Sequence, residues 1–281
     1  MRCALSDQTL EDFLREDAPY GDLTTHGLGL DDAVGRMSLA ARGPMTVCGT
    51  EEVARLMALC GAVPYVMSGS GEHVQGGTEL LSAQGPVSAL LLVRQVSLTL
   101  IEMCSGLASE VARMVTALQA AGLKIPVACT REHFPGTRSM AVKAVQAGGG
   151  MMHALGLSDS LMLLPEHRLF VDVSLDDMVG RLRKQQPEKR LVVKVTTLQE
   201  ALALAQSGAD VLLLEGFNPK GVRECKVTLH ESRLHPALAV SGGVDADNAV
   251  AYGNAGADIL VTAAPYHAPP KEVEVRFSRG L

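Results

Sequence analysis

The sequence predicts an α/β protein in which an N-terminal α+β sandwich-like domain precedes a C-terminal open parallel α/β barrel. The main observation is that short apolar, β-rich runs alternate with helical patterns from Lys124 onward, which is typical of parallel βα units. Before that point the pattern lacks this alternation. The 281 residues suffice for two domains that each bury a core. We therefore predict domains at residues 1–110 and 111–268.

The first domain is expected to begin with a helix capped by Ser6. The elements expected after it are strands near 33–41 and 45–49, a helix at 50–60, a strand at 78–83 and helical structure over 87–121. The last of these is expected to bridge the two domains. The tail, 269–281, regains strand character in EVEVRF, and we expect it to return to the first domain.

The second domain contains six expected strands, at residues 125–130, 161–164, 190–195, 210–214, 238–241 and 259–262. Helix starts lie between them. Ser174 and Thr197 each stand three residues ahead of an acidic residue, which approximates a capping box, and Asp245 is expected to cap the helix after the fifth strand. Six strands alternating with helices predict a TIM-like barrel.

The composition excludes several classes of protein. The formal net charge is −6 and aromatic residues make up 3%, so neither a basic surface nor a stacking platform for nucleic acid is expected. The continuous apolar runs are far shorter than the roughly 20 residues that a bilayer requires. Six cysteines stand apart without CxxC spacing, which indicates reduced thiols. No membrane association and a cytoplasmic location are expected.

Functional residues of parallel barrels lie at the carboxyl ends of the strands. Here the expected strands end in polar or small residues: Thr130 and Arg131, Lys194, Glu215, the run Ser241–Gly243, and Thr262 with Ala263 and Ala264. Strand ends are near solvent in any case, so each residue alone is weak evidence for a site. Their joint placement favours one.

The loops after the last two strands, SGG and TAA, match the usual phosphate site of such barrels. Small residues let the backbone approach an anion, so Ser241, Gly242, Gly243, Ala263 and Ala264 are candidate phosphate-binding residues. The alternative is that the glycines only form a turn.

The segment TREHFPGTR places Arg131 and Arg138 around a Pro-Gly turn, and arginine suits carboxylate or phosphate. An exposed basic loop is the alternative. Lys143 is a further candidate for substrate binding or a residue of a solvated helix face. His153 follows three glycines that break the helix, so it can approach a ligand, although a lone histidine is more often structural.

Glu215 ends the apolar strand VLLLE, where a buried carboxylate needs a partner. Ribose hydroxyls or Mg²⁺ would supply one, which makes Glu215 a candidate catalytic residue and metal ligand. The alternative is an internal ion pair with Lys194 on the adjacent strand end. Both arrangements can alternate during turnover.

With these residues placed, the chain resembles the quinolinate phosphoribosyltransferase family, and more closely its ModD branch, which is associated with molybdenum transport. The resemblance rests on EDAPYGDLTT (16–25), SGLAS (105–109), TREHFPGTR, AGGGMMHALGLSD (147–159), the Glu215 strand end, SGGV and ADILVTAAPYH (257–267). It implies a Mg²⁺-dependent enzyme that transfers phosphoribosyl from phosphoribosyl pyrophosphate and releases pyrophosphate. It also implies a homodimer with shared active sites and leaves assembly beyond the dimer open.

The resemblance implies that Arg131 and His153 face an acid substrate, that Glu215 replaces an aspartate at the ribose, and that Ser241–Gly243 hold the 5′-phosphate. Ala263 stands where the family has glycine. Lys194 replaces a glutamate, and the arginine that the partner subunit contributes in the family falls on Gln95, with Arg94 adjacent.

Further family cations are replaced by Glu132, Ala154 and Leu164. Because each charge-assisted hydrogen bond contributes roughly 1.5–3 kcal/mol, a dicarboxylate such as quinolinate should bind weakly. We therefore expect a ModD-type phosphoribosyltransferase with a different heterocyclic or acidic acceptor. The alternatives are a true quinolinate phosphoribosyltransferase of NAD biosynthesis and a non-catalytic molybdate-binding protein on the same fold.

Overall fold

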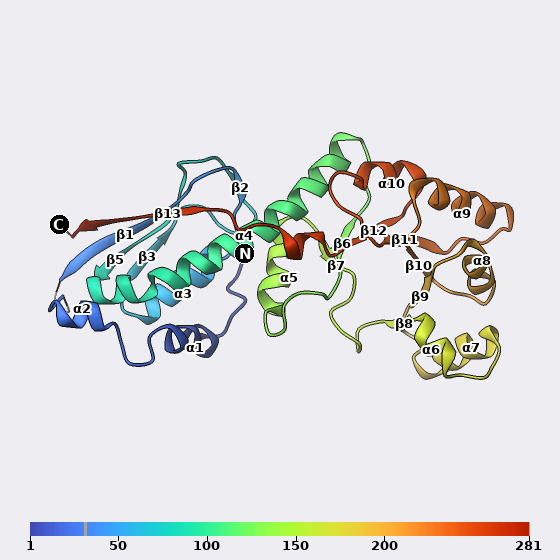
Figure 1. Cartoon of the computed structure of the whole chain (residues 1–281), viewed down its shortest axis with the longest axis horizontal. Helices are drawn as coiled ribbons and strands as arrows, with labels where there is room; N and C mark the ends of the chain where they lie inside the picture. The colour runs from blue at the N-terminus through green and yellow to red at the C-terminus, as the bar shows by residue number, and fades with distance from the viewer. Residues whose placement is uncertain (31–32, 281) are drawn as a thin grey trace. The chain divides into compact units, whose positions relative to one another are not determined.

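The computed structural model of the chain describes residues 1–30 and 33–280; residues 31, 32 and 281, the last of which ends the predicted tail, lie outside the described part. The chain divides into two compact units (Figure 1). The first contains residues up to Ala112, His133–Gly149 and the tail from His267 onward, and the second contains Arg113–Glu132 and Gly150–Tyr266. The predicted domains were 1–110 and 111–268, and the units thus differ from them in placing residues 133–149 with the first.

The first unit is an α+β structure. Its helices are α1 (Asp7–Asp17), α2 (Leu23–Gly27), α3 (Thr50–Leu59), the first part of α4 (Val87–Ala120) and α5 (Arg138–Ala147). Its strands are β1 (Val34–Ala41), β2 (Met45–Thr46), β3 (Val63–Val66), β4 (His73–Val74), β5 (Glu79–Pro86) and β13 (Val273–Arg279). Four strands form an antiparallel sheet in the order β13-β1-β5-β3, and β2 pairs with β4.

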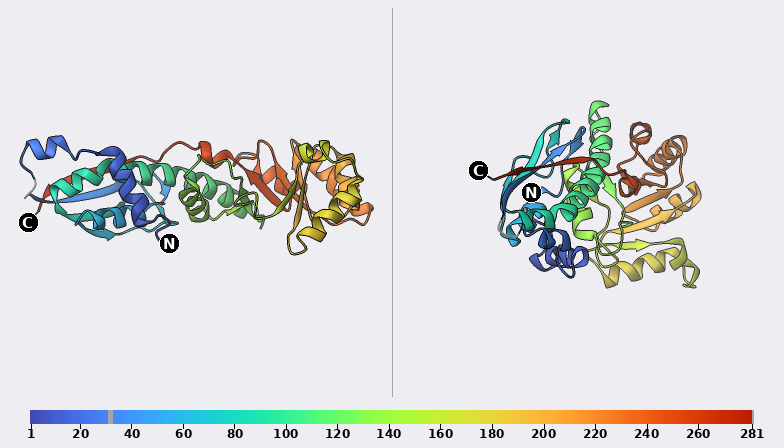
Figure 2. Two further views of the ribbon diagram at one scale, coloured as in Figure 1. Left: turned by 90° about the horizontal axis from the view of Figure 1, so that it is seen from below. Right: turned by 60° about the vertical axis from the view of Figure 1, so that its left-hand side comes forward.

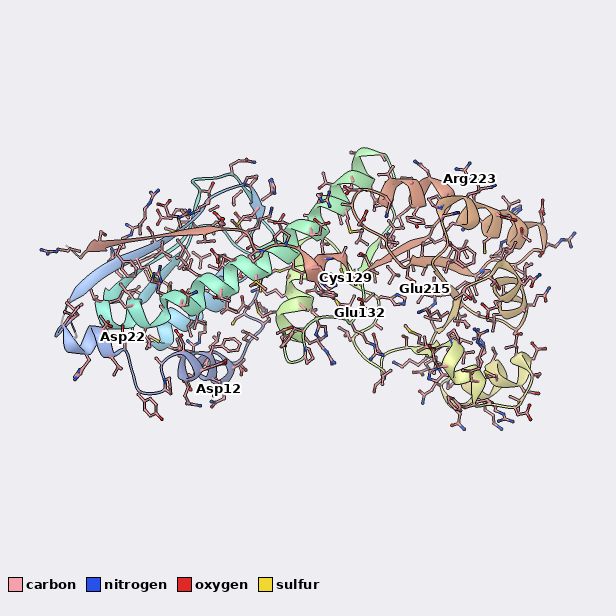
Figure 3. All side chains as sticks on the ribbon, viewed as in Figure 1. Asp12, Asp22, Cys129, Glu132, Glu215 and Arg223 are labelled. Carbon is pink, nitrogen blue, oxygen red and sulfur yellow. The ribbon has the colours of Figure 1, made fainter. Side chains whose placement is uncertain are left out.

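Helices α3 and α4 bury apolar side chains with one face of this sheet. Leu56 of α3 and Leu90 of α4 are fully buried in one cluster with Leu39 of β1 and Leu81 of β5. The tail returns to this unit, because β13 pairs with β1 along its whole length. Ser6 caps α1 as expected, since its side chain accepts a hydrogen bond from the Thr9 amide. Asp22, labelled in Figure 3, caps α2 in the same way.

Helix α4 is, among the described residues, the one helix long and apolar enough by length and composition to cross a membrane. Its apolar residues are those of a core helix. Leu90 and Ile101 are fully buried in the first unit, and Met114 is fully buried in the core of the second. Arg94 and Glu102 lie within its apolar sequence.

Lys143 of α5 is buried among carboxylates of the first unit. It is 4% exposed, and its Nζ donates to Glu51 Oε2 at 2.8 Å and to Glu52 Oε2 at 2.6 Å. Burial disfavours the ammonium, but these hydrogen bonds outweigh it and raise the pKa of Lys143 above its ordinary value. The alternative of a solvated helix face is therefore wrong for Lys143.

Because of this buried cluster, we expect the stability of the protein to be sensitive to acid. Burial opposes ionisation of Glu51, but hydrogen bonds from Lys143 and Ser70 lower its pKa to about 2. Folding lowers the pKa of Glu51. The stabilisation that its carboxylate gives the folded protein is therefore fully present above pH ~4.5 and is lost as the pH falls toward 2. We expect a loss on the order of 3 kcal/mol of unfolding free energy across that window. Urea unfolding at each pH measures it; Glu51→Gln should flatten the dependence and Glu11→Gln, on the exposed face of α1, should not.

The second unit is built from βα units. Its strands are β6 (Val127–Cys129), β7 (Met151–Met152), β8 (Leu161–Leu163), β9 (Leu191–Val195), β10 (Val211–Glu215), β11 (Ala237–Ser241) and β12 (Ile259–Thr262). Its helices are the end of α4, α6 (Pro165–Leu169), α7 (Leu175–Gln185), α8 (Leu198–Gln206), α9 (Pro219–Glu231) and α10 (Ala249–Ala255), followed by the 3-10 helix η1 (Ala264–His267).

The seven strands form a parallel sheet in the order β7-β6-β12-β11-β10-β9-β8 (Figures 1 and 2). In the described residues β7 and β8 are not paired with each other, so the barrel is open. The predicted fold class is confirmed, with one more strand than the six expected. β7 was missed because two residues are too short to produce a periodic pattern.

The predicted helix starts are confirmed at Ser174 and Thr197, whose hydroxyls accept from the amides three residues onward. The third is wrong, because α10 begins at Ala249 with Asn248 as its N-cap. Asp245 instead accepts from the amides of Asp247 and Asn248 in the turn before the helix. A short Asx-type turn thus delays the helix start by one turn.

Candidate active site

The alternation of side chains along β10 directs Glu215 into the barrel. Leu212 and Leu214 belong to the core between the sheet and the helices, whereas Val211 and Leu213 belong to a separate cluster inside the barrel. Because side chains alternate with a period of two, Glu215 shares the inner face. It follows two apolar inner residues and stands at the carboxyl end of the strand (Figure 3).

The neighbouring strands bring Lys194 and Ser241 to the same place. On β9, Val192 faces inward, and Lys194 follows it by two residues. On β11, Ala239 faces inward, and Ser241 follows it in the same way. Ser241 is paired with Glu215 in the parallel register, so the three polar groups converge at one end of the sheet.

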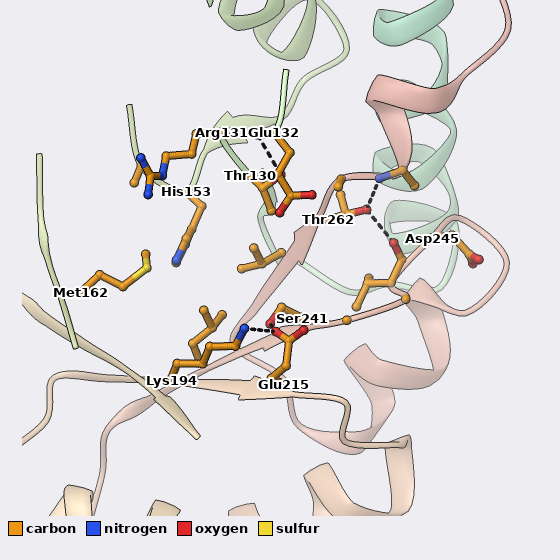
Figure 4. A pocket seen from close by; sticks show the side chains of 18 of the residues that line it. Thr130, Arg131, Glu132, His153, Met162, Lys194, Glu215, Ser241, Asp245 and Thr262 are labelled. Atoms are coloured by element: carbon orange, nitrogen blue, oxygen red, sulfur yellow. Dashed lines mark hydrogen bonds and ion pairs between the residues drawn. The ribbon is translucent and has the colours of Figure 1, made fainter. Parts of the chain in front are cut away.

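These residues line a pocket of about 500 Å³ that lies wholly within the second unit (Figure 4). Of the predicted site residues it brings together Arg131, His153, Lys194, Glu215, Ser241, Gly242, Gly243, Ala263 and Ala264. In Figure 4, Arg131 and His153 lie on one side of the pocket, and Lys194 and Glu215 lie on the other. The pocket thus has two chemically distinct sides.

The carboxylate of Glu215 has two partners in the pocket. Ser241 Oγ donates to Glu215 Oε2 at 2.5 Å, and Lys194 Nζ lies 3.5 Å from the same oxygen. The lysine and the glutamate are each about one-third exposed, so the pair is accessible to a ligand. The internal ion pair considered from the sequence is therefore present. Because both side chains are partly exposed to solvent, a ligand can replace either partner.

The turn after β11 exposes backbone amides beside this carboxylate. Gly242 and Gly243 both have positive φ, +87° and +77°, which only glycine adopts without strain. In the described part of the chain, neither amide donates to another backbone or side-chain group. Successive amides of such a turn form a concave anion site.

We expect Gly242→Ala to disturb the pocket more than a matched glycine change. A Cβ there would lie 3.0 Å from Gly216 N and 3.2 Å from Glu215 Oε1, in addition to a left-handed cost of about 1–2 kcal/mol. Gly208→Ala is the control, because Gly208 has φ +94° with open space around a Cβ. Calorimetry should show a loss of affinity of at least ten-fold, for Gly242→Ala alone, toward phosphoribosyl pyrophosphate, the substrate that the resemblance implies. Equal losses in both variants would contradict this role of the turn.

The loop after β12 has its own hydrogen bonds. Thr262 Oγ1 donates to Val244 O at 2.6 Å and accepts from the Ala264 amide at 3.0 Å. The Ala264 amide is thus already used in this structure, although both Ala263 and Ala264 line the pocket. The hydroxyl ties this loop to the glycine turn and holds the two loops of the predicted phosphate site together.

The opposite side of the pocket carries one cation and one imidazole. No carboxylate in the described chain lies within ion-pairing distance of Arg131, so its guanidinium is available to an acid. Burial lowers the pKa of His153 below its ordinary value, and its Nε2 is buried without a hydrogen-bond partner in the structure. A neutral imidazole with an unused nitrogen at the pocket suits a polar group of a ligand.

Apolar residues also line the pocket. Ala154 follows β7, Met162 belongs to β8 and Leu164 follows β8, and Glu132, next to Arg131 in the sequence, adds a carboxylate. This side therefore offers one guanidinium, an acidic neighbour and an apolar surface, which disfavours a doubly charged acid.

The remaining predicted residues belong to the first unit. Arg94 lies exposed on α4, Arg138 is exposed at the start of α5, and Lys143 is held by Glu51 and Glu52 as described above. None of these three residues is among the described residues that line the pocket of the second unit.

Sequence reasoning missed the residues that shape the first strand end. Tyr266 Oη donates to Thr130 O at 2.6 Å, and the His153 amide donates to Cys129 O at 2.9 Å. Burial raises the pKa of Cys129 to about 12, which makes its thiol unreactive. Met162 was missed as a pocket residue, although its position one residue after Leu161 in an alternating strand was a usable signal.

Two family models match nearly the whole chain. The model for the quinolinate phosphoribosyl transferase N-terminal domain matches residues 22–105, and the model for the C-terminal domain matches residues 107–276. The second match contains every residue that lines the pocket.

Relatives and solved structures agree with this match. A protein of Rhodobacter capsulatus named "Putative pyrophosphorylase ModD" is 44% identical over 87% of this chain and 95% of its own length. A protein of the same name from Pasteurella multocida is 32% identical over 98% of this chain and 99% of its own. The crystal structure of NadC from Streptococcus pyogenes has a TM-score of 0.88 at 26% identity and covers 98% of this chain and 96% of that one.

Proposed function

The chain belongs to the quinolinate phosphoribosyl transferase family, and from this premise we propose that it transfers phosphoribosyl from phosphoribosyl pyrophosphate to a heterocyclic acceptor that carries one acidic group. A phosphoribosyltransferase-type enzyme of the pentosyltransferase class is what the family assigns. The observation that carries the proposal is the placement of Glu215 beside the glycine turn, across one pocket from Arg131. ModD-named relatives support the same class.

The two sides of the pocket match the two ends of the reaction. In the transfer, the bond from ribose C1 to the pyrophosphate oxygen breaks, and a bond from C1 to a ring nitrogen of the acceptor forms. Positive charge develops on the ribose between these events. The Glu215 carboxylate is the group that would stabilise this charge, because fixed opposite charge in a pocket lowers the barrier most effectively.

Lys194 and the glycine turn would hold the anionic parts of the donor. The amides of Gly242 and Gly243 suit the 5′-phosphate. Lys194 Nζ lies 3.5 Å from Glu215 Oε2. We propose that its ammonium turns to the leaving pyrophosphate when the donor binds, which frees the Glu215 carboxylate for the ribose.

We propose that Mg²⁺ enters with the pyrophosphate of the donor. In the described part of the chain no group of three His, Cys, Asp or Glu side chains could hold a metal alone. Mg²⁺ is usually held by one or two carboxylates together with substrate phosphates, so Glu215, one of the carboxylates that line the pocket, fits this mode. When bound, Mg²⁺ would neutralise charge on the leaving pyrophosphate.

The acceptor side favours a monocarboxylate over quinolinate. Arg131 is the cation suited to one carboxylate, and neutral His153 can hydrogen-bond to a further polar atom. Ala154 and Leu164 offer no charge to a second carboxylate, and Glu132 would repel it. We also propose that the enzyme works as a homodimer in which Arg94 reaches the site of the neighbouring subunit, as the family resemblance implies.

Calorimetric titration of the protein separates this proposal from a molybdate-binding protein on the same fold. We expect phosphoribosyl pyrophosphate to bind saturably in the presence of Mg²⁺ and at least ten-fold more weakly in its absence. Molybdate should not compete below millimolar concentrations. Tight molybdate binding without any binding of phosphoribosyl pyrophosphate would replace the transferase with the oxyanion-binding alternative.

A further inference from the structure

A second cavity, of about 430 Å³, lies beside the pocket within the second unit. Three residues line both cavities: Arg131, Ala154 and Met162. Ala154 is 5% exposed and carries a single methyl group. Among the three shared residues, Ala154 therefore presents the smallest side chain at the boundary between the acceptor side of the pocket and the second cavity.

The second cavity is lined mainly by apolar side chains. They come from the segment after β7, from β8 and from α7 with the loop before it: Leu157, Leu161, Leu163, Val171, Met178 and Leu182. Leu163 and Met178 are buried, whereas Leu157 and Val171 are exposed at its margin. Such a surface gains free energy when an apolar group covers it.

Apart from Ser160, whose hydroxyl both donates and accepts, the polar side chains at this cavity are hydrogen-bond donors. Arg131 lies on the shared boundary, and Arg181 and His167 also line the cavity. His167 Nδ1 accepts from the Leu164 amide at 3.1 Å, so the neutral ring carries its proton on Nε2. No aspartate or glutamate is present among the described residues that line the cavity. The cavity therefore suits a ligand that has an apolar group and, elsewhere, a negative charge.

We propose that this cavity is a subsite for the acceptor, and that the acceptor is an N-heteroaromatic monocarboxylate with an apolar substituent about the size of a phenyl ring. The carboxylate pairs with Arg131, the ring lies against Ala154, and the substituent enters the second cavity. This inference rests on the proposed function, because the transfer requires the ring nitrogen on the Glu215 side of Ala154. Three residues border both cavities, and this adjacency to the acceptor side of the pocket favours a substrate over another occupant.

The test measures binding, so it does not depend on finding the natural acceptor. Nicotinate and its 4-, 5- and 6-phenyl derivatives are titrated into the full-length protein by calorimetry. We expect at least one phenyl derivative to bind ten-fold or more tightly than nicotinate, because a buried ring of this size favours binding by that order.

Two tryptophan variants test whether the gain in affinity of the phenyl derivatives depends on the second cavity. Val171→Trp places a large side chain at the margin of the second cavity, and Leu169→Trp makes the same change at an 80% exposed residue of α6 that lines neither cavity. We expect the phenyl gain to vanish in Val171→Trp and to persist in Leu169→Trp. Ala154→Leu, which narrows the boundary, should also reduce the gain; thermal unfolding of each variant checks that it is folded.

The possible results distinguish this inference from the proposed function. If phosphoribosyl pyrophosphate binds but no phenyl derivative binds more tightly than nicotinate, the subsite is wrong and the transferase remains. A gain that survives Val171→Trp also overturns the subsite. If no phenyl derivative binds more tightly than nicotinate, and Val171→Trp sediments as a smaller species than the wild type, the cavity is instead a contact with a second copy of the chain. If phosphoribosyl pyrophosphate fails to bind, the proposed function itself fails.

Discussion

Glu215→Gln is expected to lower kcat/KM for pyrophosphate release by about 10²–10³-fold while leaving the fold intact. The substitution keeps the size of the side chain and its ability to accept from Ser241 Oγ, but it removes the charge that we propose faces the ribose. Loss of one preorganised electrostatic group at a developing charge costs about 3–4 kcal/mol of transition-state stabilisation. The effect should appear mainly in kcat, because the charge develops only during the reaction.

The stability of the same variant serves as the structural check. Lys194 is about one-third exposed and remains solvated when its partner becomes neutral, so the free energy of unfolding should change by less than about 1 kcal/mol. Glu224→Gln, an exposed carboxylate on α9, is the matched control and should retain full activity. A Glu215→Gln enzyme within three-fold of wild type would remove Glu215 from the catalytic account.

Lys143→Met is expected to destabilise the protein by about 3–5 kcal/mol. The variant removes the cation that bonds to Glu51 and Glu52 and leaves the fully buried Glu52 carboxylate without its cationic partner. An uncompensated buried charge is much more costly than a lost surface ion pair. Urea unfolding at pH 7 measures the change, and Lys184→Met, an exposed lysine of α7, is the control.

A double variant separates loss of the charge balance from loss of packing. Glu52→Gln in the Lys143→Met background removes the unpaired carboxylate, and we expect it to restore at least half of the lost stability. If Lys143→Met is as stable as wild type but binds substrate poorly, the buried cluster is not its main role. That result would favour the substrate-binding role that the sequence suggested for Lys143.

Most of the candidate residues that the sequence places at strand ends meet in one pocket, because the barrel follows simple rules. Parallel strands bring their carboxyl ends to one side of the sheet. Side chains along a strand alternate between its two faces, so Lys194, Glu215 and Ser241 each follow one or two apolar residues on the inner face. These relations are local along each strand. They require only that the strands be identified correctly.

Other features depend on contacts that a local pattern cannot contain. The partner of Lys143 in the buried cluster, Glu52, stands 91 residues away in the sequence. The start of α10 depends on whether the Asp245 side chain caps a turn or a helix, and either outcome suits the same residues. The second cavity depends on how the segment after β7 packs beside β8, and β7 itself is only two residues long.

The most direct test of the central claim is pyrophosphate release from phosphoribosyl pyrophosphate and Mg²⁺, with nicotinate, its phenyl derivatives, quinolinate and other heterocyclic acids each offered as acceptor. We expect release that depends on one monocarboxylate acceptor, with one nucleotide formed per pyrophosphate, and little or none with quinolinate. Efficient turnover of quinolinate would contradict the account of the acceptor side of the pocket. Absence of release across the whole panel, together with no binding of phosphoribosyl pyrophosphate, would contradict the transferase itself.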